Sequence, residues 1–249
     1  MSHGTAELHD VLSKRADVLK RIHEREYDAS DLRRETEMAD STVYKSLREL
    51  EDVGLITNGG GGYDLTAYGK EVYQKHEEMS RVCKARPVLE GLGEDFDLDM
   101  VSDADTVLPE PHAPQKPVSR MEDMVNGSET VRGLAPVVTE RYVRFARRKA
   151  VEGMDAEFVL EKDVFEHVRR QYPKMLEDQL ENGVSVYVTD RTVPYGLLVS
   201  DTGVCVISYD GEGGVLGGVV SDRVPVRDKG DEVFSKYRRG ATKVRRKAV

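Results

Sequence analysis

Hydroxyl, phenol, ammonium and guanidinium groups gather within residues 41–50 of the chain. If this stretch is a helix, Val43, Leu47 and Leu50 form one apolar stripe at spacings of four and three residues. At about 100° per residue, the other side of the helix carries the polar groups. These are Ser41, Thr42, Tyr44, Lys45 and Arg48. Such side chains suit the phosphates and base edges of DNA, so the pattern predicts a helix that packs by one face and contacts DNA by the other.

Two helices are expected before this stretch. The first has apolar residues at three- and four-residue spacing, at Leu8, Val11, Leu12, Val18, Leu19 and Ile22. Asp28 or Ser30 can cap the second, in which Leu32 points inward and Arg33 and Arg34 point outward as further DNA contacts. A tight turn at residues 38–40 leads into the third helix, which Asp40 or Ser41 can cap.

A hairpin is expected after the third helix. Gly54 suits a left-handed helix end, and residues 55–57 and 63–65 have the composition of two short strands. Asn58 and four glycines at residues 59–62 join them. Together with the three helices, the hairpin predicts a winged helix-turn-helix over residues 1–83. The hairpin tip has no Arg or Lys; glycine amides can approach a phosphate, and simple turn flexibility is the alternative explanation.

A further helix is expected over residues 66–82. Its apolar stripe follows a heptad-like pattern that Lys75 interrupts, with Leu65, Tyr68, Val72, Met79 and Val82 as members. The stripe either packs within its own domain or pairs with a second copy. Because DNA-binding proteins often recognise two-fold sites as dimers, a homodimer is expected.

The charge of the chain is unusual for a protein that binds nucleic acid. The 249 residues contain 46 acidic and 37 basic side chains, and residues 85–130 alone contain 11 acidic and 3 basic ones. No part has the strong basic patch of a nonspecific DNA coat. Two hypotheses therefore compete: a sequence-specific binder in a salt-rich cytoplasm, and a helix-turn-helix used for protein contacts. The excess of Arg over Lys, 23 to 14, and the absence of Trp are compatible with a halophilic source.

Residues 84–117 are expected to form a linker region. It contains the acidic run at residues 94–99 and, within residues 109–117, four prolines that predict an extended crossing between domains. Calcium binding is not expected, because the twelve-residue loop pattern is missing.

Residues 118–240 predict an α/β domain. Strands at residues 129–134, 156–160 and 184–188 alternate with helices, as in a parallel sheet with crossover helices. Three closely spaced strands at residues 195–199, 204–209 and 215–220 should add antiparallel hairpins to a mixed sheet. A last helix is expected at residues 231–239, and the basic tail of residues 241–249 is expected to be disordered, with DNA backbone contact as the alternative.

Three segments of the second half resemble a known family. They are residues 131–138 (VRGLAPVV), 194–199 (PYGLLV) and 234–238 (FSKYR). They are similar to the regulatory domain of the archaeal methanogenesis-regulator (filamentation-regulator) family of transcription factors, and the acidity and the LPEPHAP segment at residues 108–114 resemble its haloarchaeal members. The resemblance covers most of the chain. It implies an archaeal regulator in which a winged helix precedes an α/β sensor domain whose fold is similar to half of a phospholipase-D-like enzyme.

Catalysis is not expected. Phospholipase chemistry needs His-x-Lys, and none of the six histidines has lysine two residues on. No P-loop, Gly-x-Ser-x-Gly or His-Glu-x-x-His motif occurs, and the scattered His and Cys residues favour no zinc site, so no cofactor is expected. Cys205 is expected in the core, and Cys83 is the better candidate for a thiol sensor. No apolar run approaches the ~20 residues of a membrane span and no signal peptide is visible, so the expected location is the cytoplasm.

An effector pocket is expected in the loops after the carboxyl ends of the parallel strands. Four residues near these ends are candidates for binding an anionic metabolite: Arg132, Thr139, Arg141 and Arg191. Surface ion pairs are the alternative role of the arginines. The sequence thus favours a DNA-binding transcription regulator whose second domain senses a ligand or dimerises, with a protein-interaction module as the alternative.

Overall fold

The computed structural model describes residues 4–25, 27–36, 38–92, 96–102 and 104–245, and divides the chain into two compact units. Unit 1 is Met1–Ser80 and unit 2 is Arg81–Val249. Glu94 and Asp95 of the acidic run, and Arg246 and Lys247 of the basic tail, lie outside the described residues.

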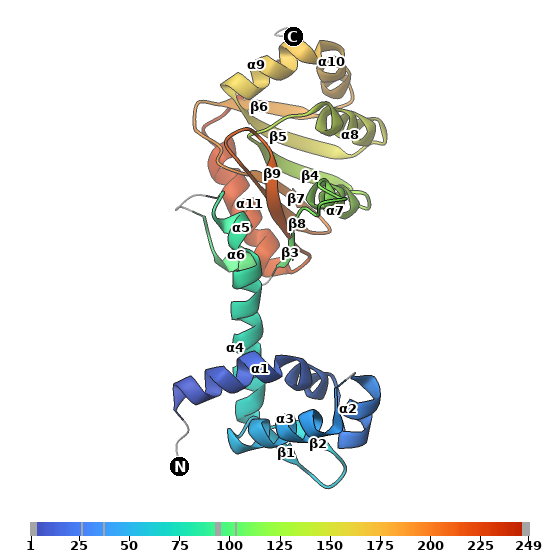
Figure 1. Cartoon of the computed structure of the whole chain (residues 1–249). Coiled ribbons are helices and arrows are strands. Elements are labelled where there is room, and N and C mark those ends of the chain that lie inside the picture. The colour runs from blue at the N-terminus through green and yellow to red at the C-terminus, as the bar shows by residue number, and fades with distance from the viewer. Residues whose placement is uncertain (1–3, 26, 37, 93–95, 103, 246–249) are drawn as a thin grey trace. The chain divides into compact units, whose positions relative to one another are not determined.

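Unit 1 consists of helices and one hairpin, in the order expected from the sequence (Figure 1). The elements are α1 (Thr5–Glu24), α2 (Ala29–Glu35), α3 (Asp40–Asp52), β1 (Ile56–Asn58), β2 (Tyr63–Leu65) and the first part of α4 (Ala67–Lys84). The apolar stripes of α1 and α3 and the inward face of the hairpin share one core. Its most buried members include Leu19, Leu32, Leu47, Leu50 and Leu55.

The helix ends of unit 1 follow ordinary capping chemistry. Asp28 caps α2 by accepting hydrogen bonds from the amides of Ser30 and Asp31, as one of the two expected alternatives. Neither Asp40 nor Ser41 caps α3, because the helix already includes Asp40 and its N-cap is Ala39, which has no side-chain acceptor. At the other end Gly54 has φ +77°, the left-handed conformation expected of a glycine after a helix.

Unit 2 is built on an eight-stranded mixed sheet with the order β10-β6-β5-β4-β7-β8-β9-β3. Its strands are β3 (Asp105–Val107), β4 (Thr130–Ala135), β5 (Asp155–Glu161), β6 (Ser185–Thr189), β7 (Gly196–Ser200), β8 (Val204–Tyr209), β9 (Val215–Ser221) and β10 (Thr242–Lys243). Strands β4, β5 and β6 are parallel, and β7, β8 and β9 continue the sheet antiparallel to their neighbours, as the sequence predicts.

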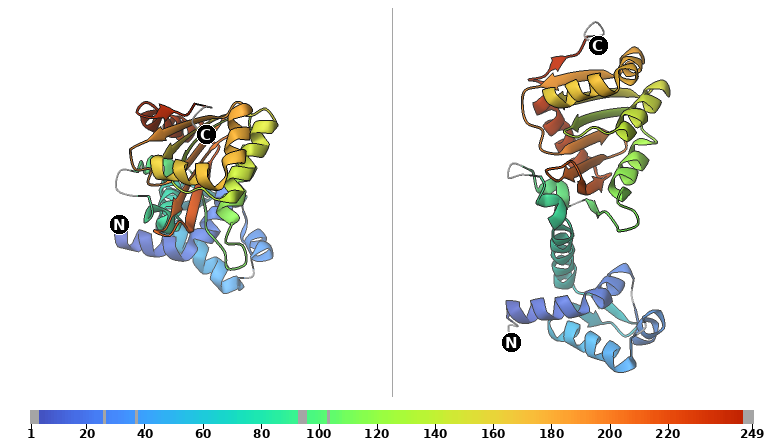
Figure 2. Two further views of the ribbon diagram at one scale, coloured as in Figure 1. Left: turned by 90° about the horizontal axis from the view of Figure 1, so that it is seen from above. Right: turned by 45° about the horizontal axis from the view of Figure 1, so that its top comes forward.

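Helices cover both faces of this sheet (Figures 1 and 2). They are α5 (Arg86–Leu89), α6 (Asp99–Ser102), α7 (Lys116–Val125), α8 (Glu140–Val151), α9 (Lys162–Gln171), α10 (Pro173–Glu181) and α11 (Val224–Arg238). One core lies under α5, α6 and α11, and a second lies under α7, α8, α9 and α10. Residues alternate between these cores along a strand: in β8, Val204 and Val206 belong to the first, and Cys205 and Ile207 to the second.

Three sequence-based expectations about unit 2 are wrong. The predicted linker of residues 84–117 contains α5, α6 and β3, and it contributes Val88, Leu92 and Phe96 to the first core. Helix α11 begins at Val224, seven residues before the predicted start, because Pro225 fits the first turn of a helix. Part of the predicted disordered tail forms β10, which pairs with β6 and is the edge strand of the sheet.

Gly69 is the position in unit 1 where a side chain is least tolerable, because α4 passes very close to the backbone of Leu55. A Cβ atom at residue 69 would lie 1.9 Å from the carbonyl oxygen of Leu55. We expect Gly69→Ala to destabilise unit 1 by about 3 kcal/mol, the upper end of what overpacking costs, because backbone and not a flexible side chain must move. Urea unfolding followed through the amide signals of β1 and β2 measures this. Gly59→Ala is the control, since a Cβ there meets nothing within 4 Å, and an equal loss in both variants would contradict the prediction.

Candidate nucleic-acid interface

Helix α3 is fixed in unit 1 by one face. Val43, Leu47 and Leu50 are at most 1 % exposed and belong to the core of unit 1. Ser46 is buried beside them, and its hydroxyl donates a 2.7 Å hydrogen bond to the carbonyl oxygen of Thr42. Periodicity alone did not identify Ser46 as buried, because a serine satisfied by its own helix looks like a surface residue in the sequence. The burial of this face determines which side of α3 remains open.

The open side of α3 contains the residues that the sequence singled out. Ser41, Tyr44, Lys45 and Arg48 are exposed, and Thr42 is half-buried. Tyr44 is the large hydrophobic residue of this side, and it is 53 % exposed. Arg48 forms no ion pair with any residue in the described parts of the chain. The side thus offers two hydroxyls, a phenol, an ammonium and a guanidinium together.

Arg33 and Arg34 of α2 are less available than expected. Arg33 is half-buried, pairs with Asp40 at 3.4 Å, and lies with its guanidinium carbon 5.8 Å from the centre of the Tyr44 ring. Arg34 is exposed but pairs with Asp31 within the same helix. Each of the two arginines therefore has an acidic neighbour, whose negative charge weakens the attraction between the guanidinium group and a phosphate.

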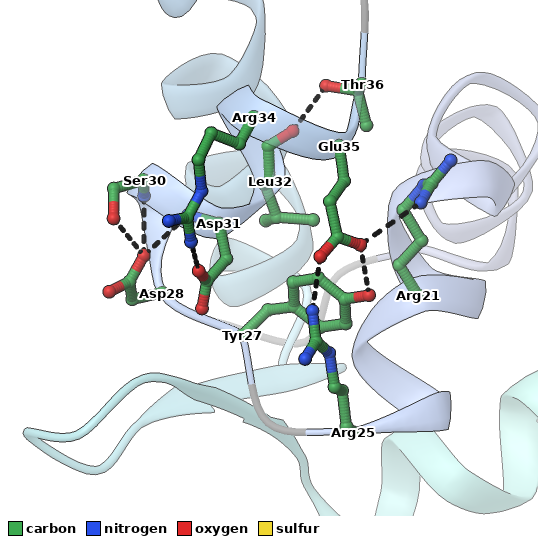
Figure 3. Close-up of polar contacts among 10 residues, drawn as sticks. All are labelled: Arg21, Arg25, Tyr27, Asp28, Ser30, Asp31, Leu32, Arg34, Glu35 and Thr36. Carbon is green, nitrogen blue, oxygen red and sulfur yellow. Dashed lines mark hydrogen bonds and ion pairs between the residues drawn. The ribbon is translucent and has the colours of Figure 1, made fainter.

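A charged cluster around Glu35 joins α2 to α1, and no pattern in the sequence predicts it (Figure 3). Glu35 receives a hydrogen bond from the Tyr27 hydroxyl at 2.7 Å, pairs with Arg25, and lies 3.7 Å from Arg21. Tyr27 is also paired through its backbone with Tyr63 of β2. Glu35 thus ties the end of α2 to the end of α1, and Tyr27 ties the segment before α2 to the hairpin.

Glu49 links α3 to α1 through Arg15. The Arg15 guanidinium donates a 2.7 Å hydrogen bond to one Glu49 oxygen, and the Lys45 ammonium lies 3.8 Å from the other. The hydrogen bond from Arg15 is the main reason why the pKa of Glu49 is lowered from its ordinary value. Glu49 therefore positions α3 and partly offsets the charge of Lys45.

The hairpin presents only backbone and neutral groups at its tip. The Gly59 amide donates to the Gly62 carbonyl at 3.1 Å, and the Gly60 amide donates to the Asn58 side chain at 3.0 Å. Gly60 has φ +86°, a conformation that favours glycine. Gly60 is therefore explained by the turn itself.

The four predicted effector residues are not brought together in one cavity. Arg132 pairs with Asp231 of α11 at 2.8 Å, on the opposite side of the sheet from α8. Arg141 donates two 2.8 Å hydrogen bonds to Glu122 of α7. The arginines thus have the surface ion pairs that were the alternative role.

The other two effector candidates also have structural roles. The Arg191 guanidinium lies 4.7 Å from the centre of the Tyr237 ring and donates to the Lys236 carbonyl. Thr139 caps α8 by accepting a hydrogen bond from the Tyr142 amide. The four residues thus do not form one anion site, and anion binding at any one of them stays a prediction, which calorimetric titration with phosphorylated and carboxylated metabolites would test.

The two cysteines differ in their surroundings. Cys205 lies in the second core of unit 2, as expected, and its burial raises the pKa of the thiol to about 12. Cys83 is exposed.

Within the described residues, no three His, Cys, Asp or Glu side chains are grouped so that they could hold a metal ion. Among the described helices, none combines the length and the apolar character needed to cross a bilayer.

Comparison with known proteins yields two matching sequence families. The family described as the methanogenesis regulatory protein FilR1, middle domain, matches residues 114–240. The family described as the HVO_A0261 N-terminal domain matches residues 5–86. No curated protein matches the sequence.

Two solved structures are similar to the chain at low identity. TrmBL2, described as an archaeal chromatin protein with a novel mode of DNA binding, is 13 % identical over 88 % of each chain, with a TM-score of 0.46. Nuc from Salmonella typhimurium, a phospholipase D family member, is 11 % identical over 57 % of this chain and 99 % of its own, with a TM-score of 0.46. At these values neither likeness extends to function.

The contact between Glu49 and Arg15 predicts a pH-dependent stability of unit 1. Because the folded pKa of Glu49 is lowered, its ionised form stabilises the fold above the unfolded pKa, and this contribution is lost as the pH falls through the folded pKa. We expect Glu49→Gln to lower the free energy of unfolding at pH 7, and this deficit to shrink as the pH falls below about 4, the ordinary pKa of a glutamate. Urea titrations over a series of pH values from 7 downward measure this. Glu51→Gln, an exposed change on the same helix, is the control; a Glu49→Gln deficit that does not shrink as the pH falls would refute the electrostatic cause.

Proposed function

The chain belongs to the family of the methanogenesis regulatory protein FilR1, and we propose that it is an archaeal transcription regulator whose unit 1 binds double-stranded DNA as a winged helix-turn-helix. One observation carries the proposal: the apolar face of α3 is fully buried, and its exposed side holds five hydrogen-bonding side chains. Helix α2 precedes α3 and a hairpin follows it, which is the order in which a winged helix-turn-helix presents a recognition helix.

The side chains of α3 suit different parts of a DNA duplex. Arg48 can donate two hydrogen bonds to a guanine edge, and Lys45 can donate to guanine or to a phosphate. Ser41, Thr42 and Tyr44 suit phosphate oxygens, and the Thr42 methyl group suits a thymine methyl. Glu49 and Asp52 repel phosphates near the end of α3, so only the first turns of the helix are expected to enter the groove.

Arg33 and Arg34 are assigned to the DNA backbone. Their acidic partners, Asp40 and Asp31, are themselves exposed or half-buried, so a phosphate can compete for the guanidinium groups. Surface ion pairs of this kind contribute at most about 1 kcal/mol, and exchanging one for a phosphate contact costs little.

Unit 2 is proposed to sense a ligand or to mediate assembly, and no catalytic step is part of its role. The sequence lacks the His-x-Lys pair that phospholipase chemistry requires. A DNA partner places the proposed function in the cytoplasm, and the acidic composition fits a halophile.

A protein-interaction module is the second candidate, favoured by the acidity of unit 1. Residues 1–80 contain 17 acidic and 11 basic side chains, so the unit as a whole repels DNA. Selection of bound sequences from random DNA, at low salt and at 1 M salt, separates the two candidates. An enriched motif supports the regulator, and no motif at either salt supports the protein-interaction module.

Arg48 gives the sharpest test of the proposed DNA contact. We expect Arg48→Ala to weaken binding of the selected sequence by about 1–3 kcal/mol, the value of a bidentate contact with guanine, and to relax the preference at one base pair. Fluorescence anisotropy titrations with the selected duplex measure this. Lys20→Ala removes an exposed cation from α1 of the same unit and is the matched control, for which nearly unchanged affinity is expected. Equal affinity of Arg48→Ala and wild type would remove Arg48 from the interface.

Helix α4 is proposed as the dimer contact. Tyr68 and Met79 are 51 % and 53 % exposed, and eleven residues of helix bring them back to the same side. A lysine at residue 79 would place a charge in an apolar seam, so we expect Met79→Lys to shift the chain from dimer to monomer. Sedimentation over a dilution series measures the ratio of the two. Glu77→Lys is the control on the same helix, and a wild-type chain that stays monomeric at the highest concentration would exclude the dimer.

A further inference from the structure

Unit 2 contains an apolar cavity of about 110 Å³ between the sheet and helices α7, α8 and α10. Its lining includes Met121 of α7, Phe145 of α8, Phe158 of β5 and Ile207 of β8. Protein interiors have few voids larger than a water molecule, so a cavity of this size needs a cause.

Two glycines of the sheet are covered by large side chains that line this cavity. A Cβ atom at Gly133 of β4 would lie 2.5 Å from Leu198 and 2.9 Å from the Phe158 ring, both of which belong to the lining. A Cβ atom at Gly196 of β7, which is itself in the lining, would lie 3.2 Å from the Tyr209 phenol oxygen. Larger residues at these two positions would displace the side chains of the wall, so the glycines help to shape the cavity.

The polar part of the cavity is a pair of tyrosine hydroxyls. The Tyr142 and Tyr209 oxygens are 3.2 Å apart and form one hydrogen bond between them. Burial raises the pKa of both phenols, so both keep their protons near neutral pH. One of the two hydroxyl protons forms the hydrogen bond between the two tyrosines. The other hydroxyl proton is free to be donated to a ligand. Gln179, also in the lining, already donates to the Val143 carbonyl at 2.9 Å.

No charged side chain lines the cavity among the described residues. An anion or a cation would lose its hydration there without a counter-charge, which is costly. The arginines predicted to bind an effector are likewise absent from the lining. The chemistry of the walls therefore selects a neutral and mostly apolar molecule.

An entrance is formed by the segment after β4. Val137, Val138 and Tyr142 line the cavity and are only half-buried. They lie at the carboxyl end of a parallel strand, where the sequence places the effector pocket. The cavity therefore lies near the predicted location of the effector pocket, whereas the residues that line it differ from the charged residues that were predicted.

The size of the cavity limits its occupant. An engineered apolar cavity of about 150 Å³ takes up benzene, and pockets for drug-sized ligands begin at about 300 Å³. We propose that this cavity binds a small neutral molecule of about the size of benzene, with one hydroxyl or carbonyl oxygen that hydrogen-bonds to the Tyr142–Tyr209 pair. This inference names the ligand class for the sensor role of unit 2 and in that sense rests on the proposed function.

Benzene and phenol are the probes that test this proposal on the full-length chain, by ligand-observed and amide-shift NMR. We expect both to shift amides of α8 and β8, with phenol bound more tightly. Because the hydroxyl that remains in a single variant could still donate, Tyr142→Phe and Tyr209→Phe are combined; the double variant should weaken phenol by about 2- to 12-fold, the value of one hydrogen bond, and leave benzene unchanged. Tyr195→Phe is the matched control, because Tyr195 is a buried tyrosine in the core on the other face of the sheet.

A filling variant tests the cavity itself. Ala146 of α8 lines it, and Ala146→Leu should abolish binding of both probes. Arg144→Leu adds the same side chain to an exposed position of α8 and should bind as the wild type does. Where Ala146→Leu does not fold by circular dichroism, Val138→Phe at the entrance replaces it.

Two outcomes would overturn the proposal: neither probe shifts the α8 and β8 amides, or the filling variant binds as well as the wild type. Titration of the same samples with the selected DNA keeps this result separate from the proposed function. If the chain binds DNA but neither probe, only the proposal of a cavity ligand is refuted. If it binds the probes but no DNA, only the proposal of a DNA-binding regulator is refuted.

Discussion

Burial of the sheet on both faces is the constraint on which unit 2 depends. Because successive residues of β8 point to opposite sides, Val206 and Ile207 each need a helix layer above them. Helices α7 to α10 supply one layer, and α11 cannot cover the other face alone. Val88, Leu92 and Phe96 complete that cover, so an acidic segment that resembles a linker in the sequence is part of the core. Its charges remain at the surface, as when Asp97 pairs with Lys229 of α11 at 2.7 Å.

In unit 1, a core smaller than those of unit 2 determines which face of α3 is buried and which is exposed. Burying a leucine side chain contributes about 1.5–3 kcal/mol, and Leu47 and Leu50 both depend on one orientation of the helix. Turning α3 to present another face would expose them. The set of side chains open to a partner is therefore a consequence of core packing, and Glu49 adds a polar restraint through Arg15.

The sequence predicted what periodicity controls and missed what tertiary contacts create. The helices of unit 1 and the strands β4 to β9 have repeating patterns, and they lie within a few residues of the expected bounds. Strands β3 and β10 are two or three residues long and exist because β9 and β6 offer open edges, which no local pattern reveals. For the site, helical spacing identified the exposed side of α3, but the partners of Arg33 and Arg132 come from other elements. The cavity was not predictable either, because it depends on Gly133 and Gly196 facing large side chains from neighbouring strands.

The distribution of charge determines how such a chain could recognise DNA. The arginines of α2 have acidic partners, whereas Arg48 has none among the described residues and Lys45 has only a 3.8 Å contact with Glu49. Long-range attraction is therefore weak, and at 1 M salt it is screened within about 3 Å in any case. Hydrogen bonds to base edges act at contact distance and are much less affected by salt. In the proposed regulator, a few such contacts on a rigidly packed helix provide the discrimination between sequences, and the acidic remainder of the chain opposes nonspecific binding.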